Sequence, residues 1–489
     1  MPQARDDYYS IPSGGSLWAG IADPYPELNA VLNLIAAAPD ESWVQLNAGR
    51  NTLQDVFAPA GLTSQLGPSG QERIQGAWPS VAWSDDRASL IIWGGGHANS
   101  PTGQVFEWRA STRDWTLAYH QADLVQVSSV PRYRSADYND TPVSSHTYGN
   151  NVWLPVLGRF LTFGGAAYGD GGTLRVYDTG TPGNQSPLRS AGAYTLDLAD
   201  AGQGKVAGAT GSNVKGTGYA GVDLDGADAW VLRDWFGQGA SHPSRPRVSG
   251  SDHDQHINCG AVATIEGGKD VVYYTAGSGT PRHLWRVEIN ADPLDDVQTH
   301  IAAQGADNSA QGQGPIALDP VRRLVVKLNN SGQGVSGALH FVDLKRTWGG
   351  TNGWRAATLT GDDAADFAGM SPNLMNAGVA YNAVKGCFTV YNMGRQVWEV
   401  YPPNSAAYAD NSNSNLTDDT GWSLVKPTMD TSGTAPRSTY VSGDAVLDET
   451  GLLGKWRWAG VLRCGIVTFG NRAGEVWAYK PTGWTDPRY

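Results

Sequence analysis

Short apolar segments separated by polar turns recur along the chain, and their spacing predicts β-strands. One clear unit starts with two apolar segments, 78–83 and 89–93, that flank the polar turn 84–87. The second segment ends at three glycines, 94–96, and apolar segments around Trp108 and Trp115 follow after a loop. Apolar runs of about 4–8 residues bounded by turn residues are typical of strands. This unit therefore predicts a small sheet of four consecutive strands.

Five further units repeat the pattern at intervals of roughly 50–75 residues. Their second strands are predicted at 159–163, 270–274, 323–327, 387–391 and 464–469. The sixth unit takes 442–447 as its first strand, and the segments 219–225 and 229–232 form either a seventh unit or the late strands of the second. Sheets this small cannot bury their own faces, so neighbours must pack face to face around an axis. The sequence predicts an all-β fold, a single six- or seven-bladed β-propeller.

The two ends of the chain suggest how the ring closes. The last unit shows three strands, whereas the Trp-led segment 42–46 has the form of a fourth strand. We expect this N-terminal strand to complete the final blade. The predicted domains are an N-terminal arm, 1–41, with a short helix within 26–38, and the propeller, 42–489.

Glycine pairs after the second strands carry a family resemblance. The segments 91–96 (Ile-Ile-Trp-Gly-Gly-Gly) and 161–165 (Leu-Thr-Phe-Gly-Gly), with aromatic third strands and spaced tryptophans, resemble kelch repeats. We expect glycine there because the turn passes close to neighbouring backbone, where a Cβ atom would clash. The resemblance implies a kelch-like propeller such as that of the galactose oxidase superfamily, and it implies a fold, not a function.

The copper site of that superfamily is not expected here. Its cysteine is matched in position by Cys259, but no paired Tyr-His segment follows, and no histidine occurs after His340. We therefore assign no copper, no other metal and no cofactor.

Composition and charge narrow the classes further. The chain has 489 residues with 62 Gly, 19 Trp and 20 Tyr, which suits short strands and tight turns better than helices. Its net charge of −12 argues against a nucleic-acid partner. Three distant cysteines argue against a disulfide scaffold, and the predicted second strands place Cys387 and Cys464 as buried packing residues. The N-terminus lacks the apolar region of a signal peptide, and no segment suits membrane insertion, so we expect a soluble protein of unknown location.

Candidate binding residues come from loops that a propeller gathers at one mouth of its channel. These loops precede the first strands or join the second strands to the third. The polar and aromatic residues that they supply are His97, Asn99, His146, Tyr168, Asp254, His256, Arg282, Asn376, Arg395 and Arg437. Such a mixture suits recognition of a glycan or a protein ligand. The alternative is that these groups cap strand ends and bind water.

The densest group of chemically active residues is the loop 251–256 (Ser-Asp-His-Asp-Gln-His). Its two histidines and flanking carboxylates suit a zinc ion, with His146 as the one candidate for a distant ligand. A solvated polar loop is the other interpretation. No metal is assigned.

No complete catalytic set stands out, so enzymatic activity stays open and we favour a binding role. The leading interpretation is a non-enzymatic recognition or structural propeller, such as a bacteriophage tail or other virion protein that binds host-surface glycan. Residues 1–41 would then dock a partner subunit. The alternatives are a carbohydrate-active propeller enzyme, either a hydrolase or a lyase, and a kelch-type protein-binding adaptor.

Overall fold

The computed structural model describes most of the strand framework. The described residues are 25–57, 74–76, 78–96, 103–119, 124–126, 133–135, 142–167, 175–177, 187–190, 192–201, 229–233, 235, 260–276, 283–302, 315–328, 338–345, 353–368, 377–403, 421–438, 451–470 and 472–489. All structural statements below refer to them.

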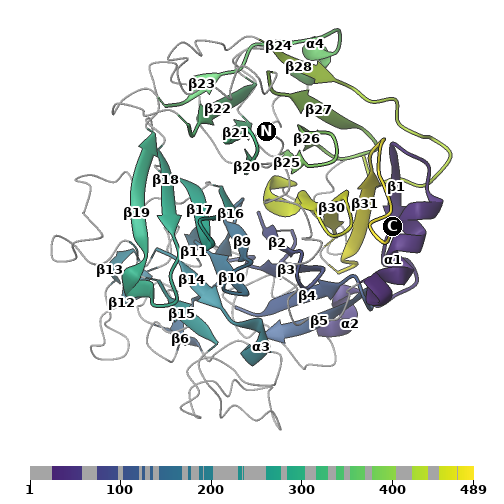
Figure 1. Cartoon of the computed structure of the whole chain (residues 1–489). Coiled ribbons are helices and arrows are strands. Elements are labelled where there is room, and N and C mark those ends of the chain that lie inside the picture. Colours follow the sequence, from purple (N-terminus) through teal and green to yellow (C-terminus); the bar gives the residue numbers. More distant parts are fainter. Residues whose placement is uncertain are drawn as a thin grey trace.

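Six antiparallel sheets stand around a central axis as the blades of a β-propeller (Figure 1). Blade 1 contains β2 (Ser80–Ser84), β3 (Ser89–Trp93), β4 (Val105–Arg109) and β5 (Asp114–Tyr119). Blade 2 contains β9 (Asn151–Leu154), β10 (Arg159–Thr162), β14 (Tyr194–Leu196) and β15 (Trp230–Leu232). Blade 3 contains β16 (Ala261–Glu266), β17 (Lys269–Ala276), β18 (His283–Glu288) and β19 (Val297–Ala302).

The remaining blades follow the same order. Blade 4 contains β20 (Ile316–Asp319), β21 (Leu324–Leu328), β22 (Leu339–Asp343) and β23 (Arg355–Ala356). Blade 5 contains β25 (Gly378–Asn382), β26 (Cys387–Tyr391), β27 (Val397–Tyr401) and β28 (Trp422–Val425), with β24 (Leu359–Thr360) added parallel to β28. Blade 6 contains β29 (Arg457–Ala459), β30 (Cys464–Phe469), β31 (Glu475–Lys480) and β1 (Ser42–Gln45).

Smaller elements lie between and around the blades. Three strand pairs join β6 (Leu124–Gln126) to β7 (Tyr133–Ser135), β8 (Ser145–His146) to β11 (Ala166–Ala167), and β12 (Arg175–Tyr177) to β13 (Pro187–Ser190). The helices are α1 (Tyr25–Ala37), α2 (Leu53–Phe57), α3 (Leu198–Ala201) and α4 (Ala364–Ala368), with two 3₁₀ turns at Pro293–Asp295 and Leu453–Lys455. The all-β propeller prediction is confirmed.

The ring closes as the sequence predicts. Strand β1 pairs antiparallel with β31, so the N-terminal strand completes the C-terminal blade. The first strands touch in the order β2, β9, β16, β20, β25, β29 and back to β2, which makes the ring continuous. The blade number is six, because the doubtful segment 229–232 supplies the fourth strand of blade 2.

One predicted strand is wrong. The first strand of blade 6 is β29, and the segment 442–447, which the sequence suggested, lies outside the described residues. The repeat was misread because β29 has only three residues, two of them Arg457 and Trp458, and its apolar signal is weak.

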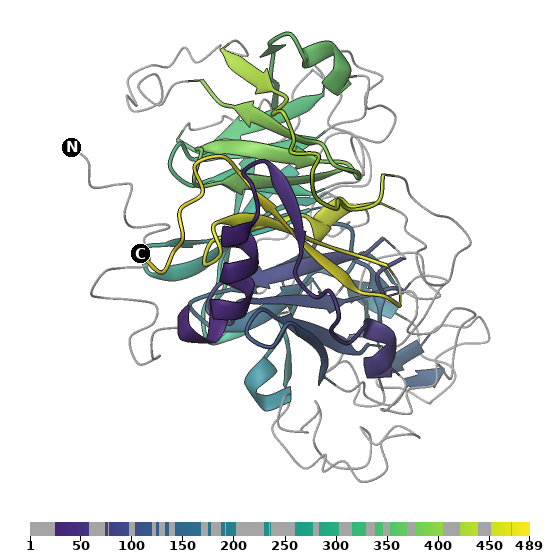
Figure 2. The same ribbon diagram turned by 90° about the vertical axis from the view of Figure 1, so that its right-hand side faces the viewer.

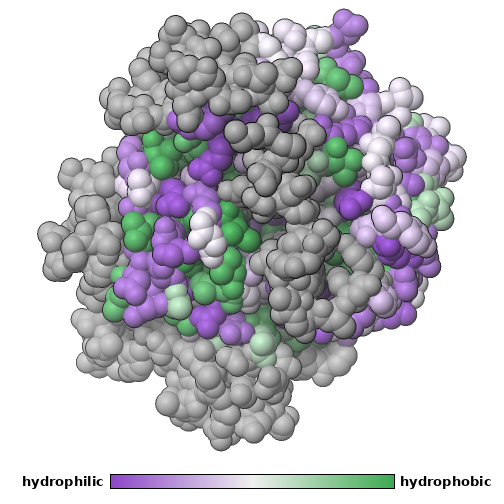
Figure 3. Space-filling view, viewed as in Figure 1, coloured by the Kyte–Doolittle hydropathy of each residue, from purple (hydrophilic) through white to green (hydrophobic). Residues whose placement is uncertain are grey.

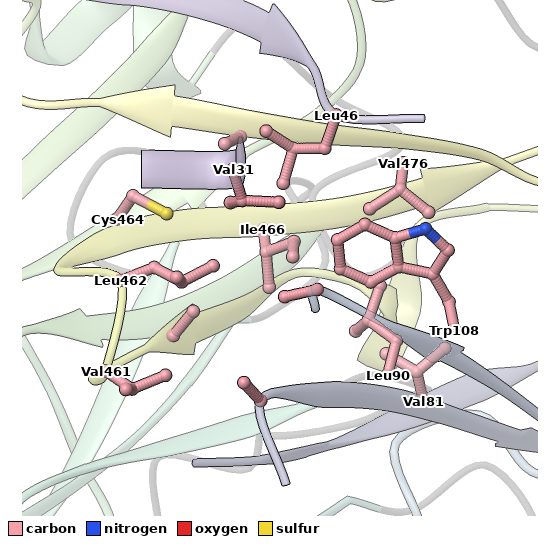
Figure 4. Close-up of a cluster of buried hydrophobic side chains, with 14 of the residues drawn as sticks. Val31, Leu46, Val81, Leu90, Trp108, Val461, Leu462, Cys464, Ile466 and Val476 are labelled. Atoms are coloured by element: carbon pink, nitrogen blue, oxygen red, sulfur yellow. The ribbon is translucent and has the colours of Figure 1, made fainter. Parts of the chain in front are cut away.

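Each blade interface holds its own apolar cluster, which is what a ring of small sheets requires. Between blades 6 and 1, Val81, Leu90 and Trp108 face Ile466 and Val476 (Figure 4). Five other clusters occupy the remaining interfaces in turn. Burial of each such side chain stabilises the fold by roughly 1.5–3 kcal/mol. Cys387 and Cys464 are buried and unbonded to one another, and burial raises the pKa of both thiols, as expected for packing residues.

Part of the N-terminal segment packs on the propeller. Helix α1 lies against blades 6 and 1, beside the C-terminal segment (Figure 2). Four of its apolar residues follow helical spacing and are buried in the cluster between these blades: Leu28, Val31, Leu32 and Ile35. Thus residues 25–37 cover the seam at which the chain ends meet.

The described surface carries only scattered apolar side chains. Small hydrophobic areas lie between hydrophilic ones on the face seen in Figure 3. The large exposed hydrophobic residues are Val156, Leu294, Val297, Val321, Val425 and Tyr489. None of the described helices has the length and apolar character needed to cross a membrane.

Candidate functional site

The channel has two ends with different chemistry. We call the end where the first strands begin the strand-start end, and the end with the turns between first and second strands the turn end. At the strand-start end, three bulky residues that precede first strands have left-handed backbones: Trp78 with φ 47°, Tyr148 with φ 48° and Leu453 with φ 48°. Each lies just before the first strand of its blade, and the three side chains pack together. Such a backbone is strained for bulky side chains, and strain of this kind clusters at functional sites.

Backbone hydrogen bonds hold these residues across the axis. The Tyr148 amide donates to the Trp78 carbonyl at 2.8 Å, and the Gly454 amide donates to the Tyr148 carbonyl at 2.9 Å. Since Gly454 belongs to blade 6 and Tyr148 to blade 2, the 3₁₀ turn Leu453–Lys455 reaches past blade 1. The strand-start end is therefore partly covered by the chain that leads into blade 6.

An arginine in the first strand of blade 6 bonds to the backbone of blades 1 and 2. Arg457 Nε donates to the Val81 carbonyl at 2.8 Å, and Nη2 donates to the Asn151 carbonyl at 2.8 Å. First strands leave backbone groups unpaired at the channel, and the guanidinium satisfies two of them. Because protein surrounds the side chain, burial lowers the pKa of Arg457 to about 10. It remains charged at neutral pH.

Aromatic and polar side chains gather around the same point. The His146 ring lies 4.6 Å from the Trp78 ring, centroid to centroid, and 6.0 Å from the Tyr148 ring. Lys455 Nζ donates to the Gln75 carbonyl at 3.4 Å. We call Gln75, Trp78, His146, Tyr148 and Lys455 the axis-end cluster. All but Trp78 are at least nine-tenths buried.

Several buried oxygens beside the cluster have no partner. Gln75 Nε2 donates to Thr468 Oγ1 at 2.9 Å, but Gln75 Oε1 accepts no hydrogen bond. The hydroxyls of Ser144 and Ser145, directly before His146, are also buried without a partner. Unsatisfied buried polar groups are costly and need an explanation. Here they form a set of acceptors next to aromatic rings.

The glycines after β3 and β10 bring this region together. A Cβ atom on Gly96 would lie 2.1 Å from the Ser144 carbonyl oxygen, and one on Gly165 would lie 1.7 Å from the His146 carbonyl oxygen. The expected reason for glycine after the second strands, close backbone approach, is confirmed at both positions.

Three of the ten predicted site residues fall on the described part of the chain. His146 belongs to the axis-end cluster. Arg395 and Arg437 lie together between blades 5 and 6, because the Gly394 amide donates to the Arg437 carbonyl at 2.6 Å. Arg395 binds the carbonyls of Asp430 and Gly433, each at 2.7 Å, which is a structural role. The other seven lie outside the described residues: His97, Asn99, Tyr168, Asp254, His256, Arg282 and Asn376.

Sequence reasoning missed much of the cluster. The sequence pattern does not mark Tyr148 and Lys455 of the cluster, or the neighbouring Arg457, as site residues, and it assigns Trp78 to the start of a strand. The signal for Trp78 and Tyr148 was available, since each is an aromatic residue just before a first strand. Lys455 and Arg457 were lost with the misplaced first strand of blade 6.

Among the described residues, no group of three or more His, Cys, Asp or Glu side chains is arranged to hold a metal ion. The loop 251–256 lies outside them.

Comparisons with known proteins show no family for this chain. No family model and no curated protein matches the chain. An α-L-arabinanase of Penicillium chrysogenum complexed with arabinobiose has a TM-score of 0.39 at 9% identity, covering 84% of this chain and 95% of that one. The α-L-arabinofuranosidase Arb93A of Fusarium graminearum has a TM-score of 0.36 at 10% identity, covering 85% and 95%. A gluconolactonase of Xanthomonas campestris has a TM-score of 0.34 at 10% identity, covering 90% and 98%.

These findings correct the leading functional prediction. The predicted non-enzymatic propeller of a phage tail or virion has no counterpart among the solved structures named above, which are an arabinanase, an arabinofuranosidase and a gluconolactonase. The kelch type is not confirmed by them.

Proposed function

We propose that the chain is a carbohydrate-active propeller enzyme, a hydrolase or a lyase, with its active site at the axis-end cluster. The observation that carries this proposal is the packed trio of Trp78, Tyr148 and Leu453, whose strained backbones meet at the mouth of the channel.

The chemistry around the trio suits a sugar. Pyranose and furanose rings offer apolar C–H faces and hydroxyl groups together. The aromatic faces of Trp78 and His146 suit the former, and the unpartnered oxygens of Gln75, Ser144 and Ser145 suit the latter. A ligand hydroxyl that donates to Gln75 Oε1 would remove the cost of leaving this acceptor buried and unsatisfied.

Proton transfer is the second requirement. His146 is the best candidate for a general base or acid, because its unperturbed pKa lies near neutrality. Lys455, whose Nζ donates to the Gln75 carbonyl, supplies a positive charge to the same cluster, which suits a developing anion or a substrate carboxylate. A lyase that removes a proton next to a uronate carboxylate needs this pair of functions. A hydrolase needs two carboxylates instead.

The test is an activity screen on the full chain. The substrates are neutral polysaccharides, including arabinan, and uronate-containing polysaccharides. Release of reducing ends without a new double bond indicates a hydrolase, and an ultraviolet-absorbing unsaturated product indicates a lyase.

Variants then locate the site. His146→Gln is expected to lower the turnover rate by roughly 10²–10⁴-fold, and Trp78→Ala to raise KM. The matched control is His340→Gln, since His340 is equally buried but lies in the third strand of blade 4, where burial lowers its pKa to about 4. No turnover on any substrate, or equal loss in the control, would refute the proposal.

A further inference from the structure

Two histidines meet at the outer edge of blade 3, away from the axis-end cluster. His283 begins β18, and His300 lies on β19, the outermost strand of this blade (Figure 1). His283 Nδ1 and His300 Nε2 are 2.9 Å apart. His283 is 7% exposed, whereas His300 is exposed.

A β-bulge brings the two rings together. The register between β18 and β19 shifts between Leu284 and Trp285, so that Leu284 faces Ala302 while Trp285 faces His300. Bulges re-aim side chains and are common where a strand carries a site. The Trp285 ring lies 4.8 Å from the His300 ring and supports it from the other side.

We propose that His283 and His300 form a transition-metal site that clamps the edge strand β19 to β18. Imidazole nitrogens bind Cu²⁺, Ni²⁺ and Zn²⁺ at about 2.0–2.1 Å. Two such ligands at a right angle stand about 2.9 Å apart, and two at the tetrahedral angle stand about 3.3 Å apart. The observed separation matches the right angle, which is the geometry of square-planar Cu²⁺ and Ni²⁺ rather than of tetrahedral Zn²⁺.

Without metal, the two nitrogens share a hydrogen bond, one as donor and one as acceptor. Metal binding needs both lone pairs, so the donor ring must move its proton to its other nitrogen. His300 can do this through water because it is exposed. No oxidation or net proton release is required when both rings are neutral. The remaining coordination positions are left to water.

The experiment is calorimetric titration of the full chain with CuCl₂, NiCl₂ and ZnCl₂ at pH 7.5 in a buffer that does not bind metals. We expect the His283–His300 pair to bind one Cu²⁺ ion per chain. At this site Cu²⁺ should bind more tightly than Ni²⁺ or Zn²⁺. His300→Asn removes a ligand from an exposed position, so folding should be unaffected. Loss of a residue that only hydrogen-bonds to a metal ligand weakens metal affinity by roughly 10–100-fold. Because His300 is itself a proposed ligand, we expect His300→Asn to weaken the Cu²⁺ affinity by at least this factor.

Two controls separate the pair from other histidines. His340→Asn and the double variant His253→Asn/His256→Asn are each expected to keep this bound Cu²⁺ ion. Nitrogen splitting from two imidazoles in the Cu²⁺ electron paramagnetic resonance spectrum should disappear in His300→Asn. Binding should also be lost below about pH 6, when imidazoles become protonated. If His300→Asn binds Cu²⁺ like the parent, or if the loop variant abolishes Cu²⁺ binding, the pair is only a hydrogen bond and the proposal is wrong.

Discussion

The two ends of the channel differ in the side chains that lie there. At the turn end, polar side chains bind one blade to the next at five of the six interfaces. The bonds are Asp85 to the Val461 amide, Asp270 to the Val156 and Leu157 amides, Glu266 to Arg323, Arg322 to the Gly386 carbonyl, and Glu41 to Lys385. At the strand-start end, the described residues include the packed trio Trp78, Tyr148 and Leu453 and the buried, unpartnered oxygens of Gln75, Ser144 and Ser145. Left-handed backbones are common to both ends, since Ala88, Arg323 and Arg463 at the turn end also have positive φ. The two ends therefore differ in the kind of group: charged side chains join the blades at the turn end, whereas aromatic rings and neutral buried oxygens gather at the strand-start end.

The largest effect should come from the closest backbone approach at the strand-start end. Gly165→Ala places a Cβ atom 1.7 Å from the His146 carbonyl oxygen, and backbone on both sides prevents relaxation. We expect a loss of roughly 3–5 kcal/mol in the free energy of unfolding, measured by urea denaturation.

The matched control for this variant lies at the turn end. Gly158 has φ +65°, but a Cβ atom there meets nothing within 4 Å. Gly158→Ala should cost only about 1 kcal/mol. If the two variants are equally stable, the strand-start end is not close-packed, and the proposed binding geometry loses its rigid support.

Asp270 should make the stability of the turn end depend on pH. Its carboxylate accepts the Val156 amide at 3.0 Å and the Leu157 amide at 2.8 Å, yet burial raises its pKa to about 6. A raised pKa means that the folded chain keeps a proton that the unfolded chain has lost. Stability should therefore fall as pH rises from about 4 to about 6, by on the order of 3 kcal/mol, and then stay level.

Substitution isolates this contribution. Asp270→Asn cannot titrate, so its unfolding free energy should change less than that of the parent between pH 4 and pH 7. Asp319→Asn, at the equivalent cap of its own turn in blade 4, is the comparison variant. Identical pH profiles for the parent and Asp270→Asn would show that another group causes the slope.

Glu41, the residue before the ring-closing strand β1, bonds to the C-terminal segment and should stabilise this closure. Burial alone would raise the pKa of Glu41, but hydrogen bonds from Lys385, Tyr479 and Thr482 together lower it. Glu41→Gln should reduce stability by about 2 kcal/mol at pH 7. The difference should shrink as pH falls through the lowered pKa, because the parent then loses the same charge.

A surface ion pair provides the control for Glu41. Glu288 pairs with Lys269, whose side chain is 48% exposed. Glu288→Gln should change stability by less than about 1 kcal/mol. If Glu41→Gln and Glu288→Gln reduce the free energy of unfolding equally, the Glu41 contacts between the chain ends are no more stabilising than a surface ion pair.

The sequence predicted the framework because the framework rests on repeated local signals. The second strands, the glycines after them and the strand Ser42–Gln45 all follow from apolar runs and turn residues. The candidate site was predicted only in part, through His146. Lys455 and Arg457 act through a crossing of the axis that depends on how three blades meet, and no local pattern encodes such a crossing. The pair His283 and His300 depends on a bulge, which shifts register without a mark in the apolar pattern.

The smallest change in stability should come from the most informative residue of the strand-start end. Gln75→Met removes one hydrogen bond, from Nε2 to Thr468, which costs about 1 kcal/mol, but it also removes the unsatisfied Oε1, whose burial costs about 1–3 kcal/mol. The two nearly cancel, so stability should change by less than about 1 kcal/mol while sugar binding weakens. Asn47 is the matched control, because both ends of its amide are bonded, to the Gly474 carbonyl at 2.8 Å and the Val476 amide at 2.9 Å. Asn47→Leu should cost about 2–3 kcal/mol and leave binding unchanged. A large stability loss in Gln75→Met, with binding intact, would mean that the strand-start end is held together in the same way as the turn end.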